Sequence, residues 1–146
     1  MDFKKIVAGL LIFTLVYVSS SLAGSDFKEI DTAQLHSMIV DNAYRLEGGR
    51  EKQFTVIDAR EKEAYDNAHI FSAISIPEKD FDIFKHRLPG KKDLLLVVYS
   101  NAKGETGRQW AHRAALEGYT NIAIYSEGFS VWQKKRMPVA PLSQRR

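Results

Sequence analysis

Apolar residues recur along this chain with two different periods that alternate. Short runs rich in β-branched and aromatic residues predict strands, and polar stretches with an apolar residue every three or four positions predict helices. The expected strands cover residues 27–30, 54–60, 73–77, 93–99 and 121–125. The expected helices begin at Asp31 or Thr32 and then cover residues 61–69, 78–88, 108–117 and 127–135.

The order of these segments predicts the fold class. The first helix carries Leu35, Met38 and Ile39 on one face, and the polar residues 42–53, with their glycine pair, are expected to form a surface loop. The run 93–99 is apolar on both faces, which is typical of a central parallel strand. We therefore expect an α/β fold of three layers, in which about five mainly parallel strands are flanked by helices.

The first 23 residues have the pattern of a secretory signal peptide. A lysine pair precedes the apolar run 6–18, which is short for a bilayer span of about 20 residues. Ser21 and Ala23 are the small residues expected before a cleavage site. We expect cleavage after Ala23, a single domain over residues 24–146, and a periplasmic or secreted protein. The alternative is an uncleaved anchor, the one route by which we expect membrane attachment.

Composition excludes several kinds of chemistry. The formal net charge is +3 without a dense basic block, so nucleic-acid binding is not expected. The chain contains no cysteine, which excludes disulfides, thiolate metal sites and thiol chemistry from its own side chains. Its four histidines are widely spaced, so we expect no metal site and no cofactor.

Two separated segments carry a family resemblance. The first, "VIDAREKEAYDNAHIFSAISIP", resembles the opening signature of the rhodanese family, and the second, "EGYTNIAIYSEGFSVWQKKRMPV", resembles its closing stretch. The matching positions are Asp58, Arg60, Glu63, Tyr65, His69, Ile70, Ala73, Ile76, Pro77, Gly118, Tyr119, Asn121, Gly128, Trp132, Pro138 and Val139. Ala68, Ser72 and Glu127 stand where the family has glycines. The chain therefore resembles the rhodanese family over about residues 27–140.

The resemblance implies a sulfurtransferase scaffold without its reactive group. The family carries sulfur on a cysteine at the end of the central strand, and this chain has Ser100 there. A thiol near neutral pH is partly thiolate, whereas an alcohol stays protonated without an adjacent base and holds no persulfide. The resemblance also implies that Asp58 and Arg60 support the base of the site and that His69 fixes a turn.

The loop after the central strand is a candidate anion site. Backbone N–H groups that precede a helix, with nearby cations, favour a small sulfate- or thiosulfate-like oxyanion. The candidate residues are Ser100, Asn101, Ala102, Lys103, Gly104, Glu105, Thr106, Gly107 and Arg108. The segment lacks the lysine-serine ending of a nucleotide phosphate loop.

The expected function is non-enzymatic, namely anion binding or interaction with an unidentified protein partner in a regulatory role. One alternative is a thiosulfate-type sulfurtransferase, either because Ser100 replaces a native cysteine or because a partner supplies the thiol. A lesser alternative is a hydrolase that uses Ser100. The surroundings of Ser100 are not a G-x-S-x-G nucleophile elbow, and no histidine is placed by the sequence to act as its base.

Overall fold

A computed structural model describes residues 27–101 and 104–141 of the chain. The predicted signal peptide, together with Ala102 and Lys103 of the predicted anion loop, lies outside the described residues. The elements in chain order are β1 (Lys28–Ile30), α1 (Thr32–Glu47), β2 (Phe54–Asp58), α2 (Lys62–Asn67), β3 (His69–Ile70), β4 (Ile74–Ser75), α3 (Phe81–Phe84), a 3₁₀ turn (Lys85–Arg87), β5 (Leu95–Tyr99), α4 (Glu105–Leu116), β6 (Ile122–Tyr125), α5 (Gly128–Lys134) and β7 (Val139–Ala140).

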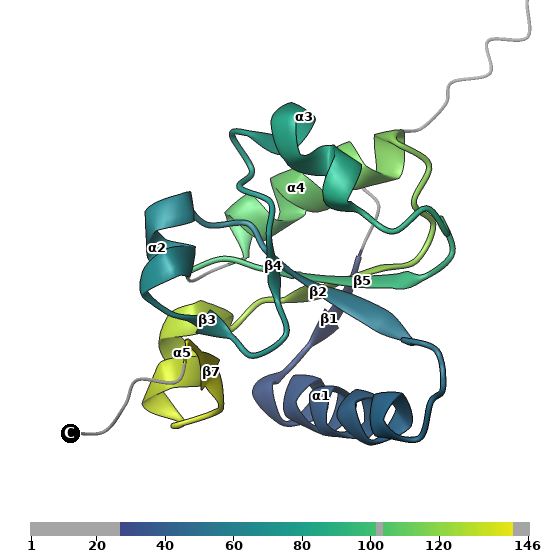
Figure 1. The fold of residues 1–146 in the computed structure, drawn as a ribbon. Coiled ribbons are helices and arrows are strands. Elements are labelled where there is room, and N and C mark those ends of the chain that lie inside the picture. The colour runs from purple at the N-terminus through teal and green to yellow at the C-terminus, as the bar shows by residue number, and fades with distance from the viewer. Residues whose placement is uncertain (1–26, 102–103, 142–146) are drawn as a thin grey trace, which may run out of the picture.

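The main sheet has five strands in the order β1-β6-β5-β2-β4, and every neighbouring pair is parallel. The predicted α/β class and the five parallel strands are confirmed. Strand β5 lies at the centre of the sheet (Figure 1), where Leu96, Val97, Val98 and Tyr99 are fully buried. Continuous burial of this kind is the reason that its sequence is apolar on both faces.

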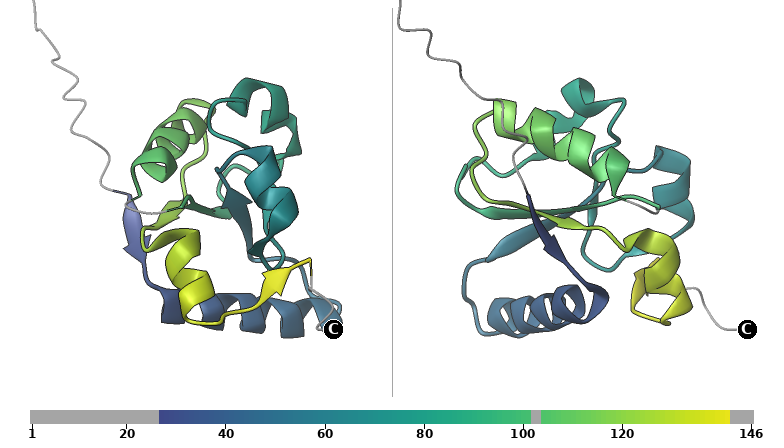
Figure 2. Two further views of the ribbon diagram at one scale, coloured as in Figure 1. Left: turned by 90° about the vertical axis from the view of Figure 1, so that its left-hand side faces the viewer. Right: turned by 180° about the vertical axis from the view of Figure 1, so that it is seen from behind.

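Helices cover both faces of this sheet (Figures 1 and 2): α3 and α4 lie on one side, and α1 and α5 lie on the other. Alternate residues of each strand enter separate cores because successive side chains of a strand point to opposite faces. Val97 and Tyr99 of β5 pack with α1 and α5, whereas Leu96 and Val98 pack with α4. Trp132 and Trp110 are fully buried in these two cores, respectively.

The boundaries of three predicted elements were wrong. Residues 42–47, predicted as loop, extend α1, because Asn42 is buried and its side-chain oxygen accepts the Gln53 N–H at 3.0 Å. Helix α4 begins at Glu105, before the predicted start at residue 108, after Gly104 with a φ of 67°. The helix predicted over residues 78–88 is only α3 and the 3₁₀ turn.

A small antiparallel sheet was not predicted. Strands β3 and β7 pair His69 with Ala140 and Ile70 with Val139. Each strand has only two residues, too few to show an alternating pattern. The pairing ties the segment after α5 to the segment after α2, as the left view of Figure 2 shows.

Candidate anion-binding site

Ser100 follows β5 directly, at the carboxyl end of the central strand, and is only 5% exposed. The start of α5 fixes its backbone: the Phe129 N–H donates to the Ser100 carbonyl oxygen at 2.8 Å, and the Ser130 N–H donates to that of Asn101 at 3.3 Å. The residue at the family's cysteine position is therefore held in place before the loop begins.

A polar cavity of about 310 Å³ opens beside Ser100. It lies where β2 and β5 end, and the carboxyl ends of parallel strands are the usual ligand sites of such sheets. Its lining residues are Ala59, Arg60, Glu61, Ala64, Glu78, Lys79, Ser100, Asn101 and Thr106. Four residues predicted for the site, namely Arg60, Ser100, Asn101 and Thr106, thus come together in one cavity.

The first turn of α4 borders this cavity through Thr106. Gly104 precedes the helix in a left-handed conformation, and its carbonyl oxygen accepts the Arg108 N–H at 2.8 Å. Gly107 is buried against Ile124, since a Cβ atom there would meet the Ile124 side chain at 3.5 Å. The helix end therefore lies close to the sheet, and its first N–H groups have no intrahelical acceptor.

Several predicted site residues do not line the cavity. Arg108 makes an ion pair with Glu29 of β1, and their side chains are 42% and 45% exposed. Glu105 is exposed on the first turn of α4, and neither it nor His69 is among the lining residues. Conversely, Glu61 and Lys79 line the cavity as an ion pair that no sequence motif indicated.

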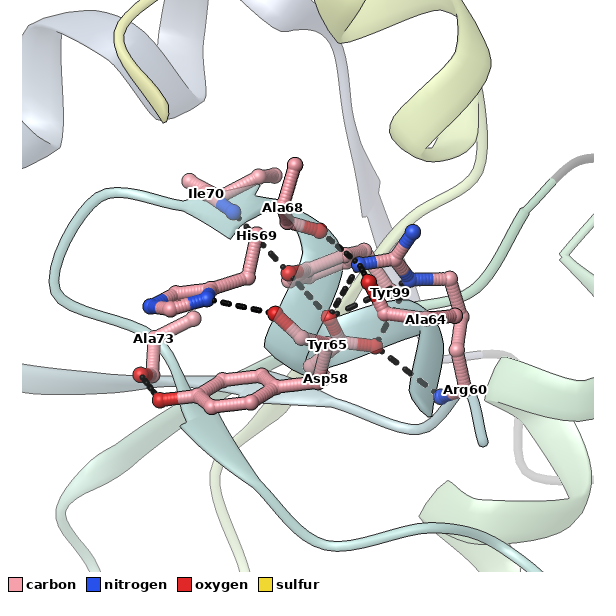
Figure 3. Close-up of polar contacts among 9 residues, drawn as sticks. All are labelled: Asp58, Arg60, Ala64, Tyr65, Ala68, His69, Ile70, Ala73 and Tyr99. Carbon is pink, nitrogen blue, oxygen red and sulfur yellow. Dashed lines mark hydrogen bonds and ion pairs between the residues drawn. The ribbon is translucent and has the colours of Figure 1, made fainter. Parts of the chain in front are cut away.

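Behind the cavity, Asp58, Arg60 and Tyr99 form a buried network (Figure 3). Arg60 Nη2 donates to Asp58 Oδ2 at 2.6 Å, and Arg60 Nε donates to Asp58 Oδ1 at 2.9 Å. The Tyr99 hydroxyl donates to Asp58 Oδ2 at 2.5 Å and accepts the Ile70 N–H at 3.1 Å. Arg60 Nη2 also donates to the Ala68 carbonyl oxygen at 2.7 Å. One buried carboxylate thereby holds β2, β5 and the segment around β3 together.

The network fixes the charge states of its members. Burial opposes the charged form of Arg60, but the hydrogen bonds and charge of Asp58 outweigh it and raise the pKa of the guanidinium. Burial, and then the negative charge of Asp58, raises the pKa of the Tyr99 phenol well above its ordinary value. Tyr99 is therefore a neutral hydrogen-bond donor. The Arg60 guanidinium also lies 3.8 Å from the centre of the Phe129 ring, within the range of a cation–π contact.

His69 is occupied in a turn beside this network. Its Nδ1 lies 2.8 Å from the Tyr65 carbonyl oxygen, and its ring stacks on the Tyr65 ring with centroids 3.7 Å apart. The Tyr65 hydroxyl donates to the Ala73 carbonyl oxygen at 2.9 Å (Figure 3). All four histidines are among the described residues, and none of them lines the Ser100 cavity.

Glu127, which stands in place of a family glycine, holds the start of α1. Its Oε2 accepts the Thr32 N–H at 2.7 Å and the Thr32 hydroxyl at 2.6 Å. Lys135 Nζ donates to its Oε1 at 3.1 Å. The carboxylate satisfies an N–H group that has no partner within the helix and carries the negative charge favoured at a helix N-terminus.

These contacts predict an acid-sensitive contribution to stability. Hydrogen bonds from Thr32, and then from Lys135, lower the pKa of Glu127. A carboxyl whose pKa is lowered by folding stabilises the protein above its unfolded pKa of about 4.3, and this contribution is lost as the pH falls through the folded value. We expect Glu127→Gln to be less stable than the unaltered chain at neutral pH, with the difference shrinking below about pH 4.

Urea unfolding at several pH values measures this effect. Glu105→Gln removes an exposed carboxylate that forms no ion pair within the described part of the chain, and it serves as the control. A difference between Glu127→Gln and the unaltered chain that stayed constant down to acid pH would contradict the assignment.

A second, larger hollow of about 410 Å³ lies beside α1 and is almost entirely apolar. It is lined by His36, Ile39, Val40, Ala43, Tyr44, Glu47, Phe71, Trp132 and Pro138. It includes none of the residues predicted for the site.

In residues 27–101 and 104–141, no group of acidic or histidine side chains is arranged to hold a metal, and no helix is long and apolar enough to cross a membrane.

The comparisons with known proteins place the chain in a family. The model of the rhodanese-like domain matches residues 41–135, so the chain belongs to the rhodanese-like domain family. No curated protein matches the chain.

Solved structures of the same kind resemble this one. The rhodanese-like domain of the Alr3790 protein from Anabaena sp. is 25% identical, with a TM-score of 0.62 over 81% of this chain and 82% of that chain. The BH2092 protein of Bacillus halodurans is 26% identical, with a TM-score of 0.59 over 77% of this chain and 75% of that chain. A rhodanese-related protein of Thermoplasma volcanium, at 22% identity, shares the fold with a TM-score of 0.59 over 77% of this chain and 97% of that chain.

Proposed function

We propose that this rhodanese-like domain transfers no sulfur through its own side chains and binds a small sulfate- or thiosulfate-like oxyanion in the Ser100 cavity. The observation that carries the proposal is a buried serine at the end of β5 that faces a polar cavity and has no histidine beside it. An alcohol without a base stays protonated, so it neither attacks a sulfur donor nor stores a persulfide. The absence of a histidine beside Ser100 argues against a serine hydrolase of the Ser-His type.

The Ser100 hydroxyl is suited to donate to a ligand. It forms no hydrogen bond with any other residue that the structure describes. A hydroxyl carries one donor and rotates to meet an acceptor. Thr106 supplies a second hydroxyl in the cavity lining, and the first turn of α4 favours negative charge.

Charge pairing limits the affinity of this cavity. Arg60 is paired with Asp58, and Lys79 is paired with Glu61, so neither cation is wholly available to a ligand. Glu78, which also lines the cavity, adds negative charge near Arg113. We therefore expect binding no tighter than about millimolar, which corresponds to about −4 kcal/mol. The N-terminal sequence supports a place of action outside the cytoplasm as part of this proposal.

A residue-resolved titration tests the proposal. Thiosulfate added to the isotope-labelled full chain should produce saturable shifts of the Ser100, Asn101 and Thr106 amide resonances. Ser100→Ala should weaken this binding because the variant lacks the donor hydroxyl, whereas Arg108→Gln should not, because Arg108 lies outside the cavity lining. No saturable shift at these amides would overturn the proposal and leave interaction with a protein partner as the better account.

A further inference from the structure

The opposite end of the sheet holds a second polar cavity. Phe54 and Leu95 are register partners at the amino ends of β2 and β5, and the residues before them form the rim. The cavity measures about 300 Å³ and is lined by Arg45, Glu51, Lys52, Gln53, Lys91, Asp93, Leu94, Leu95 and Asn121. Because Ser100 lies at the carboxyl ends of the same strands, the two cavities are separate.

Arg45 lines this cavity from the last turn of α1. Its Nε atom is buried and has no hydrogen-bond partner among the described residues. A buried donor without a partner destabilises the folded state, and such groups are rare in folded proteins. The Arg45 side chain forms no hydrogen bond or ion pair with any described residue, so the rest of its guanidinium is left to donate to a ligand in the cavity.

Two lysines line the same cavity without a carboxylate partner. Neither Lys52 nor Lys91 forms an ion pair with any described residue, although Glu51 and Asp93 also line the cavity. The surroundings of Lys52 are partly desolvated, and this lowers the pKa of its ammonium. Three cationic side chains therefore line the cavity with two carboxylates and form no ion pair with them, so the net charge of the lining is positive.

Hydrogen bonds hold the segments that carry these charges. The Gln53 N–H donates to Asn42 of α1 at 3.0 Å, so the segment carrying Lys52 is tied to the helix carrying Arg45. On the other side, the Asn121 side-chain amide donates to the Asp93 carbonyl oxygen at 3.3 Å, and the Asn121 backbone carbonyl oxygen accepts the Leu96 N–H at 2.9 Å. The cations thus come from segments whose backbones are positioned before any ligand arrives.

We propose that Arg45, Lys52 and Lys91 form a second oxyanion site, which takes a phosphate group either as free inorganic phosphate or as a phosphate monoester. A guanidinium donates well to tetrahedral oxyanions, and lysines provide additional positive charge. A dianion matches the positive balance of the cavity and accepts from the Arg45 guanidinium, which has no acceptor within the described part of the chain. The site depends on no residue of the Ser100 cavity.

Titration of the isotope-labelled full chain with inorganic phosphate tests this site. Saturable shifts are expected at the Arg45, Lys52 and Gln53 amides. Arg45→Gln should weaken binding about tenfold, a loss of about 1.4 kcal/mol, since it removes one charge-assisted contact. Arg50→Gln is the matched control, because Arg50 is an exposed arginine that does not line the cavity.

Lys52→Gln is a second variant, in case Arg45→Gln perturbs α1. Weakened binding in either cavity variant, with a spectrum that otherwise matches the unaltered chain, supports the site. Unchanged binding in both variants, or no saturable shift at the three amides, overturns it.

A parallel titration with glycerol phosphate distinguishes a phosphate monoester from free phosphate as the ligand. Binding at least as tight as that of inorganic phosphate identifies a monoester, and weaker binding identifies the free ion. The Arg45, Lys52 and Gln53 amides report on this cavity, and the Ser100, Asn101 and Thr106 amides report on the other. Absence of phosphate binding at the first set therefore leaves the Ser100 proposal intact.

Discussion

Asp58→Ala is expected to lower the free energy of unfolding by about 3–5 kcal/mol, the cost of removing one partner from a buried ion pair. Asp58 is fully buried, and its removal leaves Arg60, which is 7% exposed, as an uncompensated buried charge. It also leaves the neutral Tyr99 hydroxyl without its acceptor. Urea unfolding at neutral pH measures the loss.

The matched control is Asp66→Ala. Asp66 also belongs to an ion pair, with Lys62, but its side chain is 56% exposed. Exposed pairs contribute about 0–1 kcal/mol, so this variant should lose little stability. Equal losses for Asp58→Ala and Asp66→Ala would show that the network behind the cavity does not hold the fold together.

Ser100→Cys is expected to give the chain measurable sulfur transfer from thiosulfate to cyanide. A thiolate would attack the outer sulfur of thiosulfate, and sulfite would leave with the electron pair of the broken bond. Cyanide would then take that sulfur as thiocyanate and release the thiolate. The first turn of α4, which borders the cavity, favours the thiolate over the thiol.

The Ser100→Cys prediction is checked by thiocyanate formation over time. Ser100→Ala is the control, because it changes the same buried position without adding a nucleophile. The Ser100→Cys variant should form thiocyanate, and the Ser100→Ala variant should form none. If neither variant forms thiocyanate, while thiosulfate still shifts the Asn101 amide of the unaltered chain, then the missing thiol is not the single chemical defect.

Much of the sheet could be predicted because its strands are buried in a regular pattern. The apolar run before Ser100 became β5, the central strand, and the alternation of strands and helices gave the parallel topology. The extension of α1 to Glu47 was missed because polar residues 42–47 look like a loop, whereas Asn42 is buried by a tertiary contact with Gln53. Strands β3 and β7 are too short to have a period.

The site was predictable where chemistry or the family pattern marked a position, as for Ser100 and Arg60. It was not predictable where it depends on side chains from distant segments. Lys79 and Glu61 line the cavity as a pair separated along the chain, and no local motif marks them. Arg108 was predicted for the anion loop because it follows that loop in the sequence. It forms an ion pair with Glu29 of β1 instead. The pairing of Arg108 with Glu29 depends on the position of β1 in the sheet, which a single sequence does not reveal.

Thiocyanate formation by the unaltered chain shows directly whether this domain binds the anion without transferring sulfur. The assay supplies cyanide together with thiosulfate at a concentration that saturates the shift of the Asn101 amide. We expect the cavity to be occupied by thiosulfate while no thiocyanate forms above a protein-free blank. Thiocyanate that rises in proportion to the concentration of the unaltered chain would contradict it.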